Sequence, residues 1–293
     1  MRLVRFRHNF APNGSARLGA VNGDSIVDLA ASCPELPRTM PELLPLGTAE
    51  IEAQLANKEL IAIALSDATL LAPIERPGKI LGIGLNYRDH AAETGREPPA
   101  IQTWFVKQAT AVNDPFGDIA FPKVSSALDY EVELVVVIGK RGRHVPVERA
   151  HEIIAGYCVG NDVSVRDWQR ATPTMIMGKG FDTHAPFGPW IVTPDELGPL
   201  PDLRLRCFVN GEQRQNGRAG DMIFGIEAQI AHLTAAFTLE PGDIIFTGTP
   251  AGVGIAMSPP GFMKPGDIVR CEIDGIGAIQ SKIVTETGEM VIG

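Results

Sequence analysis

Three acidic residues stand beside two apolar segments, and their types and spacing indicate a metal site. Glu131 and Glu133 are two residues apart at the start of the strand-like run 134–138, so both carboxylates point to the same side. Asp162 follows a second apolar run, 153–160. Buried carboxylates are costly unless an opposite charge compensates them, and three carboxylates with water suit a hard cation such as Mg²⁺. The alternative is that the two glutamates form the solvated face of an edge strand.

A histidine and a glutamate form a second candidate group. His90 and Glu93 are i, i+3 in the helix-like segment 88–95, so their side chains share a face and can hydrogen-bond. A histidine that a carboxylate orients is a general base able to activate water. The same spacing also fits an exposed pair on the surface of a short helix.

Two lysines and a glycine-rich loop offer contacts to an anion. Lys107 ends the short strand-like segment 103–107, and Lys179 lies between two glycines, where the backbone can approach a ligand closely. The loop 247–254 is not a Walker phosphate loop, because it lacks the Lys-Ser/Thr pair. It still offers backbone N–H groups and the Thr249 hydroxyl to a carboxylate. The alternative for Lys179 is an ordinary exposed surface lysine.

Composition narrows the class of protein. The chain of 293 residues has a net charge of -9, which argues against nucleic acid or an anionic membrane as a main partner. The four cysteines (Cys33, Cys158, Cys207 and Cys271) are scattered without a C-x-x-C pair, as in reduced cytosolic proteins. The first ten residues contain no continuous apolar run, so we expect no secretory signal, and no apolar run reaches the ~18 residues of a membrane helix. We therefore expect a cytoplasmic enzyme or binding protein.

The order of predicted elements divides the chain in two. The 31 glycines and 23 prolines indicate many turns and an all-β or mixed α/β body. Residues 1–72 are predicted to form a small N-terminal α+β domain with a helix over 49–65, and residues 73–293 the catalytic domain. Within the second part we expect helices over 145–155 and 226–237.

The separated motifs resemble the fumarylacetoacetate hydrolase family, in the family's order and over about residues 73–286. They include G-L-N-Y-R-D-H-A-A-E at 84–93, D-Y-E-V-E-L at 129–134, G-N-D-V-S-V-R-D-W-Q at 160–169, G-K-G-F-D at 178–182 and L-E-P-G-D-I-I-F-T-G-T-P-A-G-V-G at 239–254. The resemblance implies a mainly β, mixed α/β fold with a β-sandwich/β-roll catalytic domain. It also implies a homodimer with bound Mg²⁺ or Mn²⁺. The N-terminal module is similar to the variable domain of many bacterial members.

The resemblance also assigns roles by position. It implies metal ligation by Glu131, Glu133 and Asp162, catalysis by the water-activating dyad His90 and Glu93 and by Lys179, and substrate binding by Lys107, Arg166, Gln169 and Thr249. The family pattern places the dyad on a short helix that orders over bound ligand. The stretch 170–177 is more apolar than in many members, and Gly180 stands where Ser is common. The resemblance therefore does not predict the chemical identity of the substrate's tail.

The predicted substrate is a small anionic 2-oxo acid. The first expectation is hydrolysis of a C–C bond in an acylpyruvate-like or 2,4-dioxo acid, diketo-deoxy sugar acids included, to pyruvate and a second acid. The same metal–enolate platform also serves decarboxylation of oxaloacetate-like acids and isomerisation or hydration of 2-hydroxy-dienoates. A non-catalytic metal-dependent binding protein is the remaining alternative. Only hydrolysis strictly needs activated water, which His90 with Glu93 favours.

Overall fold

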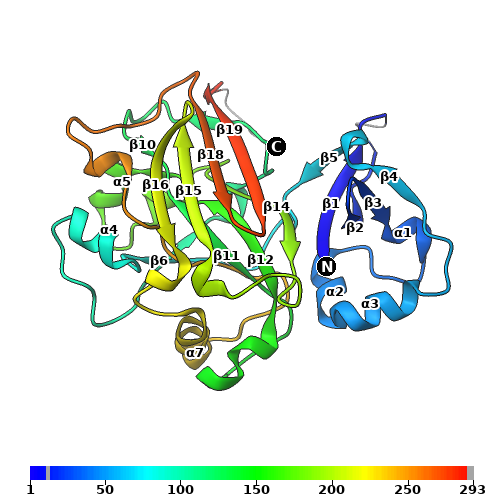
Figure 1. The fold of residues 1–293 in the computed structure, drawn as a ribbon. Coiled ribbons are helices and arrows are strands. Elements are labelled where there is room, and N and C mark those ends of the chain that lie inside the picture. The colour runs from blue at the N-terminus through cyan, green and yellow to red at the C-terminus, as the bar shows by residue number, and fades with distance from the viewer. Residues whose placement is uncertain (11–13, 289–293) are drawn as a thin grey trace.

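The computed structural model describes residues 1–10 and 14–288, and its main element is a twelve-stranded mixed sheet (Figure 1). Ten strands follow the order β4-β3-β2-β1-β14-β12-β11-β17-β6-β7, while β5 pairs with β1 and β8 with β14. The strands are β1 (Arg2–His8), β2 (Arg17–Asn22), β3 (Ser25–Asp28), β4 (Ala62–Ala64), β5 (Ala68–Leu71), β6 (Ile80–Gly84), β7 (Thr103–Lys107), β8 (Val112–Asn113), β11 (Val132–Ile138), β12 (Ile154–Asn161), β14 (Ala185–Val192) and β17 (Ile244–Phe246).

A second sheet of five strands has the order β16-β15-β18-β19-β9, and β10 pairs with β13 separately. These strands are β9 (Ile119–Phe121), β10 (Leu128–Asp129), β13 (Ser164–Val165), β15 (Arg204–Val209), β16 (Glu212–Arg218), β18 (Ile268–Ile273) and β19 (Gly277–Thr285). The helices are α1 (Leu29–Ser32), α2 (Met40–Leu43), α3 (Gly47–Leu55), α4 (Arg88–Glu93), α5 (Arg166–Ala171), α6 (Ile176–Lys179) and α7 (Ile226–Ala236).

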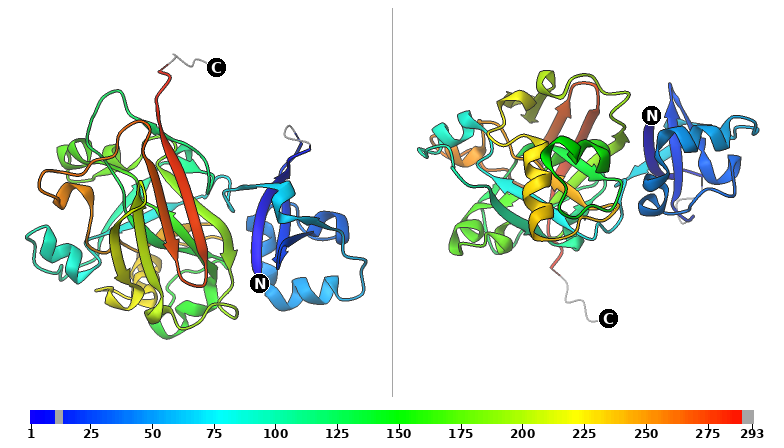
Figure 2. Two further views of the ribbon diagram at one scale, coloured as in Figure 1. Left: turned by 45° about the horizontal axis from the view of Figure 1, so that its top comes forward. Right: turned by 90° about the horizontal axis from the view of Figure 1, so that it is seen from below.

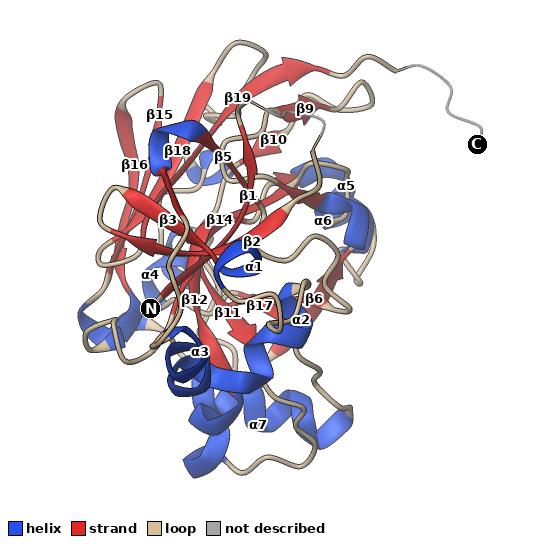
Figure 3. Cartoon of the chain, turned by 90° about the vertical axis from the view of Figure 1, so that its right-hand side faces the viewer, coloured by secondary structure: helices blue, strands red, loops and turns tan. Residues whose placement is uncertain are grey.

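The central strand β11 is buried on both faces. Leu134, Val136 and Ile138 belong to the core shared with α7 and the five-stranded sheet. Val135 and Val137 belong to the core shared with α1 to α3. Successive side chains of a strand point to opposite faces, so burial on both sides requires the unbroken apolar run in the sequence. Figure 3 shows α2 and α3 in front of β11, β12 and β17.

The N-terminal strands continue the central sheet, because β1 pairs with β14 at Arg2↔Val192 and Leu3↔Ile191. Figure 2 shows this N-terminal part, in blue, on the flank opposite the cyan helix α4. The division of the chain at residue 72 stays a prediction, as do the homodimer and the cytoplasmic location. Among the described helices, none combines the length and the apolar character that a bilayer crossing demands.

Two predicted helices differ from the structure, whereas α7 matches its prediction. The predicted helix 49–65 ends at Leu55, because Ala62–Ala64 pairs with β3 as a strand. The predicted α-helix 145–155 is a 3₁₀ helix over Val147–Ile153. Ile154 already pairs with β11, so the sheet ends the helical segment there. Tertiary pairing overrides local propensity at both places.

Candidate active site

Strand pairing brings the three predicted metal carboxylates together. Glu131 directly precedes β11, Glu133 lies in it, and Asp162 directly follows the neighbouring antiparallel strand β12. The Asp162 N–H donates to the Glu131 carbonyl oxygen over 2.8 Å. One ligand atom from each side chain lies within 4.8 Å of the others, and all three residues are buried. The arrangement places hard oxygen ligands within reach of one cation.

Three cations surround the triad. Lys107 Nζ lies 2.6 Å from an Asp162 carboxylate oxygen, and Lys179 Nζ bridges Asp162 and Glu131, 2.6 Å from Glu131 Oε2. Arg166 Nη1 lies 2.7 Å from the other Glu131 oxygen. All these side chains are buried, so the ion pairs act in a medium that screens them weakly. We call the set Lys107, Glu131, Glu133, Asp162, Arg166 and Lys179 the buried charge cluster.

Within this cluster the two glutamates differ in their electrostatic environment. Burial raises the pKa of Glu131, but the charges of Arg166 and Lys179 outweigh it and bring the pKa to about 2. Burial raises the pKa of Glu133 well above its usual value, and the other two carboxylates raise it further. Its Oε2 accepts a 2.7 Å hydrogen bond from the Gly248 N–H. Glu133 is the carboxylate whose negative charge is least compensated, and a divalent cation would provide that compensation.

The predicted dyad is assembled on α4. His90 Nδ1 lies 2.6 Å from Glu93 Oε1, and Glu93 Oε2 accepts a 2.8 Å hydrogen bond from the Gly252 N–H. Glu93 therefore ties the imidazole to the glycine-rich loop. Among the described residues, His90 Nε2 has no hydrogen-bond partner, so this nitrogen can exchange a proton with a ligand. The helix is formed in this structure, and its ordering over bound ligand stays a prediction.

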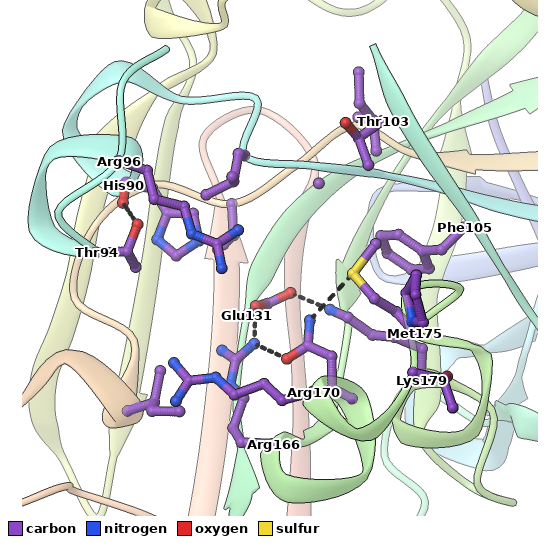
Figure 4. Close-up of a pocket in the computed structure, with 18 of the residues that line it drawn as sticks. His90, Thr94, Arg96, Thr103, Phe105, Glu131, Arg166, Arg170, Met175 and Lys179 are labelled. Carbon is purple, nitrogen blue, oxygen red and sulfur yellow. Dashed lines mark hydrogen bonds and ion pairs between the residues drawn. The ribbon is translucent and has the colours of Figure 1, made fainter. Parts of the chain in front are cut away.

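A cavity of about 640 Å³ joins these groups (Figure 4). Seven of the ten predicted site residues line it: His90, Glu131, Glu133, Arg166, Gln169, Lys179 and Thr249. The other three lie behind the lining. Glu93 contacts the lining residue His90, Asp162 contacts the lining residue Lys179, and Lys107 contacts Asp162. The structure brings all ten residues together, and their individual roles stay predictions.

The hydrogen bonds of Thr249 refine its predicted role. Its hydroxyl donates to the Val132 carbonyl over 2.9 Å and accepts from Gln215 Nε2 over 2.7 Å. The hydroxyl proton is thus already used by the backbone. The Thr249 N–H has no hydrogen-bond partner within the described chain, which makes it the donor that a substrate carboxylate would meet in this loop.

Arg166 is held so that one donor stays available. Its Nε donates to Asp129 over 2.8 Å, while Nη1 contacts Glu131 and donates to Gln169 Oε1 over 3.0 Å. Nη2 is buried without a hydrogen-bond partner in the part of the chain that the structure describes. A buried donor without a partner is costly, and an anionic ligand would satisfy it.

The sequence reasoning missed several residues of this site. Asp129 holds Arg166 and accepts N–H groups from Gly254 and Ile255, and its place two residues before Glu131 was the available signal. Gln215 accepts from the Val132 N–H besides holding Thr249, but it comes from the other sheet and carries no local signal. Two further arginines, Arg96 and Arg170, line the cavity.

Comparison with known proteins agrees with this geometry. The family model described as fumarylacetoacetate (FAA) hydrolase C-terminal matches residues 79–284. The chain is 41% identical to the oxaloacetate tautomerase FAHD2A, mitochondrial, of Bos taurus over 288 residues, which cover 97% of this chain and 92% of that protein. The chain therefore belongs to the fumarylacetoacetate hydrolase family, a family of enzymes, and the predicted family is confirmed.

Two solved structures share the fold over nearly the whole chain. The fumarylacetoacetate hydrolase (EaFAH) from psychrophilic Exiguobacterium antarcticum has a TM-score of 0.85 and 33% identity, covering 98% of this chain and 100% of that one. The maleylpyruvate hydrolase from Sphingobium sp. SYK-6, in complex with manganese(II) ion and pyruvate, has a TM-score of 0.80 and 32% identity, with coverage of 98% and 100%. The predicted fold class is confirmed, and this manganese-bound relative and the buried triad both point to divalent metal binding.

Proposed function

We propose that this protein is a divalent-metal-dependent tautomerase that interconverts the enol and keto forms of oxaloacetate or a similar 2-oxo acid. The observation that carries the proposal is a carboxylate-held imidazole, His90, lining the same cavity as the buried carboxylate triad. The relatives named oxaloacetate tautomerase, about 40% identical over nearly the full chain, support this reaction over hydrolysis as the first choice. Mg²⁺ is the proposed resident cation, with Mn²⁺ as a substitute.

The buried triad suits a hard cation by its donor atoms, and Glu131, Glu133 and Asp162 would hold it. When bound, a divalent cation polarises the 2-oxo group and makes negative charge on its oxygen less costly. The Thr249 N–H and Arg166 Nη2 would bind the carboxylate next to that group. These contacts orient the substrate, so that C3 is presented to the same residues in every turnover.

Tautomerisation then requires only proton movement. In the ketonisation direction the enol hydroxyl loses its proton and C3 gains one, so neither water nor a second substrate is consumed. His90 Nε2 would deliver the proton at C3 and recover one from solvent, while Glu93 keeps the ring oriented. Lys179 carries a fixed positive charge beside the triad, which stabilises the negative charge that develops on the substrate oxygen.

A second candidate is hydrolysis of an acylpyruvate, which was the first expectation from the sequence. The same dyad could take a proton from water, and the similar structure named maleylpyruvate hydrolase supports this reaction. Decarboxylation of oxaloacetate uses the same head group but leaves the dyad without a necessary role.

The test follows the loss of ultraviolet enol absorbance for oxaloacetate and acetylpyruvate, with Mg²⁺, with Mn²⁺ and with EDTA, while pyruvate is assayed separately. Metal-dependent enol loss from oxaloacetate without pyruvate release supports the tautomerase. Pyruvate with carbon dioxide from oxaloacetate would instead establish a decarboxylase, and pyruvate with acetate from acetylpyruvate a hydrolase. Equal rates with and without EDTA would contradict all three.

A further inference from the structure

We infer that Arg96 and Arg170, the rim arginines, form a second anion subsite that binds the distal carboxylate of a 2-oxo dicarboxylic acid. This inference rests on the proposed function, because it assumes that the 2-oxo acid head occupies the buried charge cluster. Both arginines line the same cavity as that cluster. Figure 4 shows the Arg96 side chain beside His90 and the Arg170 side chain lower in the view, next to Arg166.

Local structure explains why Arg170 faces the cavity. It lies on α5 three and four residues after Asp167 and Arg166, and residues at i and i+4 share a helix face. Arg166 and Gln169 line the cavity from the same helix, so that face is directed at the substrate. Once residues 166–170, R-D-W-Q-R, are known to be helical, the spacing places Arg170 on the same helix face as Arg166.

Arg96 is placed by the turn that ends α4. Gly95 has a left-handed φ of +69°, and its N–H donates to the Ala92 carbonyl over 3.0 Å. The Arg96 N–H donates to the Ala91 carbonyl over 2.9 Å, which completes a Schellman turn. The turn folds the chain back over the helix end, so Arg96 lies in the same short segment as His90. A ligand that contacts Arg96 is thereby linked to the segment that carries the proton-exchanging group.

Charge distinguishes the rim arginines from the other cations of the site. Lys107, Lys179 and Arg166 each contact a buried carboxylate. In residues 1–10 and 14–288, neither Arg96 nor Arg170 has an ion pair or a side-chain hydrogen bond, and both are exposed. Two unpaired cations at the mouth of one cavity are notable in a chain with a net charge of -9.

The charge of the substrate head completes the argument. The cluster with Asp129 holds four carboxylates against three cations, so a divalent cation leaves one net positive charge. The head carboxylate of a 2-oxo acid neutralises that charge. The rim arginines then remain without a counter-charge, and a second carboxylate provides one. Their long flexible side chains can follow substrate tails of different length.

The experiment compares two substrates in the metal-loaded enzyme. Arg96→Gln, Arg170→Gln and the double variant are assayed with oxaloacetate, whose tail is a carboxylate, and with acetylpyruvate, whose tail is a neutral ketone. We expect each single change to raise KM for oxaloacetate about tenfold with little change in kcat, because a charge-assisted hydrogen bond is lost. For acetylpyruvate we expect no more than about a twofold change in KM. Arg88→Gln is the matched control, since Arg88 is exposed at the start of α4, the helix that precedes Arg96, and lies outside the cavity lining.

Binding gives a second readout that does not depend on turnover. Oxalate resembles the 2-oxo acid head and has no tail, so its stabilisation of the protein against heat should be the same in wild type and rim variants. Stabilisation by oxaloacetate should be weaker in the variants. If the rim substitutions weaken the binding of oxaloacetate, acetylpyruvate and oxalate equally, or weaken none of them, the rim subsite is wrong while the proposed function stands. If wild type turns over neither acid but oxaloacetate binding still needs the arginines, the subsite stands and the proposed function fails.

Discussion

The two ends of the active-site cavity are built in opposite ways. At the inner end, every cation contacts a carboxylate, and the six residues of the buried charge cluster are between 0% and 5% exposed. At the outer end, the rim arginines are exposed and lack partners among the described residues. The three carboxylates of the inner end lie on or directly beside two paired strands of the central sheet. Of the rim arginines, Arg170 lies on the six-residue helix α5 and Arg96 in the turn that ends the six-residue helix α4.

We expect the inner end of the cavity to carry out the reaction and the outer end to determine which substrates bind. A buried charge cannot be removed without leaving its partner unpaired in a weakly screened environment, so the inner end tolerates little change. An exposed arginine can be replaced at small cost in folding, so the outer end can adapt to new tails. Under the proposed function, the inner end would bind the 2-oxo acid head and the rim arginines would bind the tail.

The largest effect on activity and stability should come from a substitution within the buried charge cluster. Glu131→Ala removes one proposed metal ligand and leaves Arg166 and Lys179 without their shared partner. We expect loss of bound metal, a fall in kcat/KM of at least about 10³-fold, and about 3–5 kcal/mol less stability. Metal content by atomic emission, kinetics and thermal unfolding measure these outcomes. Glu148→Ala, at an exposed glutamate, is the control. A Glu131 variant with full metal content and normal turnover would show that the triad is not the metal site.

A smaller effect is expected from the dyad, which links the two ends. His90→Asn should keep the metal, because His90 is not part of the triad, and lower kcat by about 10²–10⁴-fold. Glu93→Gln should also lower kcat, because the glutamine has only one oxygen and loses one of the two contacts to His90 and Gly252. The decrease should be smaller than for His90→Asn, because the imidazole itself is still present. Metal content and the rate of enol loss are measured together for both variants. Normal turnover by the His90 variant would remove the dyad from the mechanism.

The inner end was more predictable from the sequence than the outer end. Glu131 and Glu133 are two residues apart at the start of a strand-like apolar run, and Asp162 follows the next apolar run, so local pattern was enough to group them. Gln215 could not be found this way, because it reaches Thr249 and the Val132 N–H from the second sheet. Contacts between sheets depend on packing, which no local pattern records.

The arrangement of the N-terminal part was also beyond local pattern. An α+β composition was predictable for this part, but its continuation of the central sheet through Leu3↔Ile191 was not, because such pairing joins segments nearly 190 residues apart. The rim arginines were missed for a related reason. Arg96 and Arg170 come from separate motifs, and only the fold places them at one cavity.

The smallest effect tests the outer end without removing a charge. Gly95→Ala forces an alanine into a φ of +69° in open space, so the cost is only the backbone conformation, about 1 kcal/mol. Gly23→Ala, at a φ of +57° with equally open surroundings in the N-terminal part, is the matched control. Thermal unfolding should show a similar loss for both. Only Gly95→Ala should raise KM for oxaloacetate, by up to about fivefold if the whole strain displaces Arg96. The rate with acetylpyruvate should stay unchanged, because the inner end is untouched. If Gly23→Ala raises KM equally, the effect comes from general destabilisation, and the turn after α4 has no part in recognition.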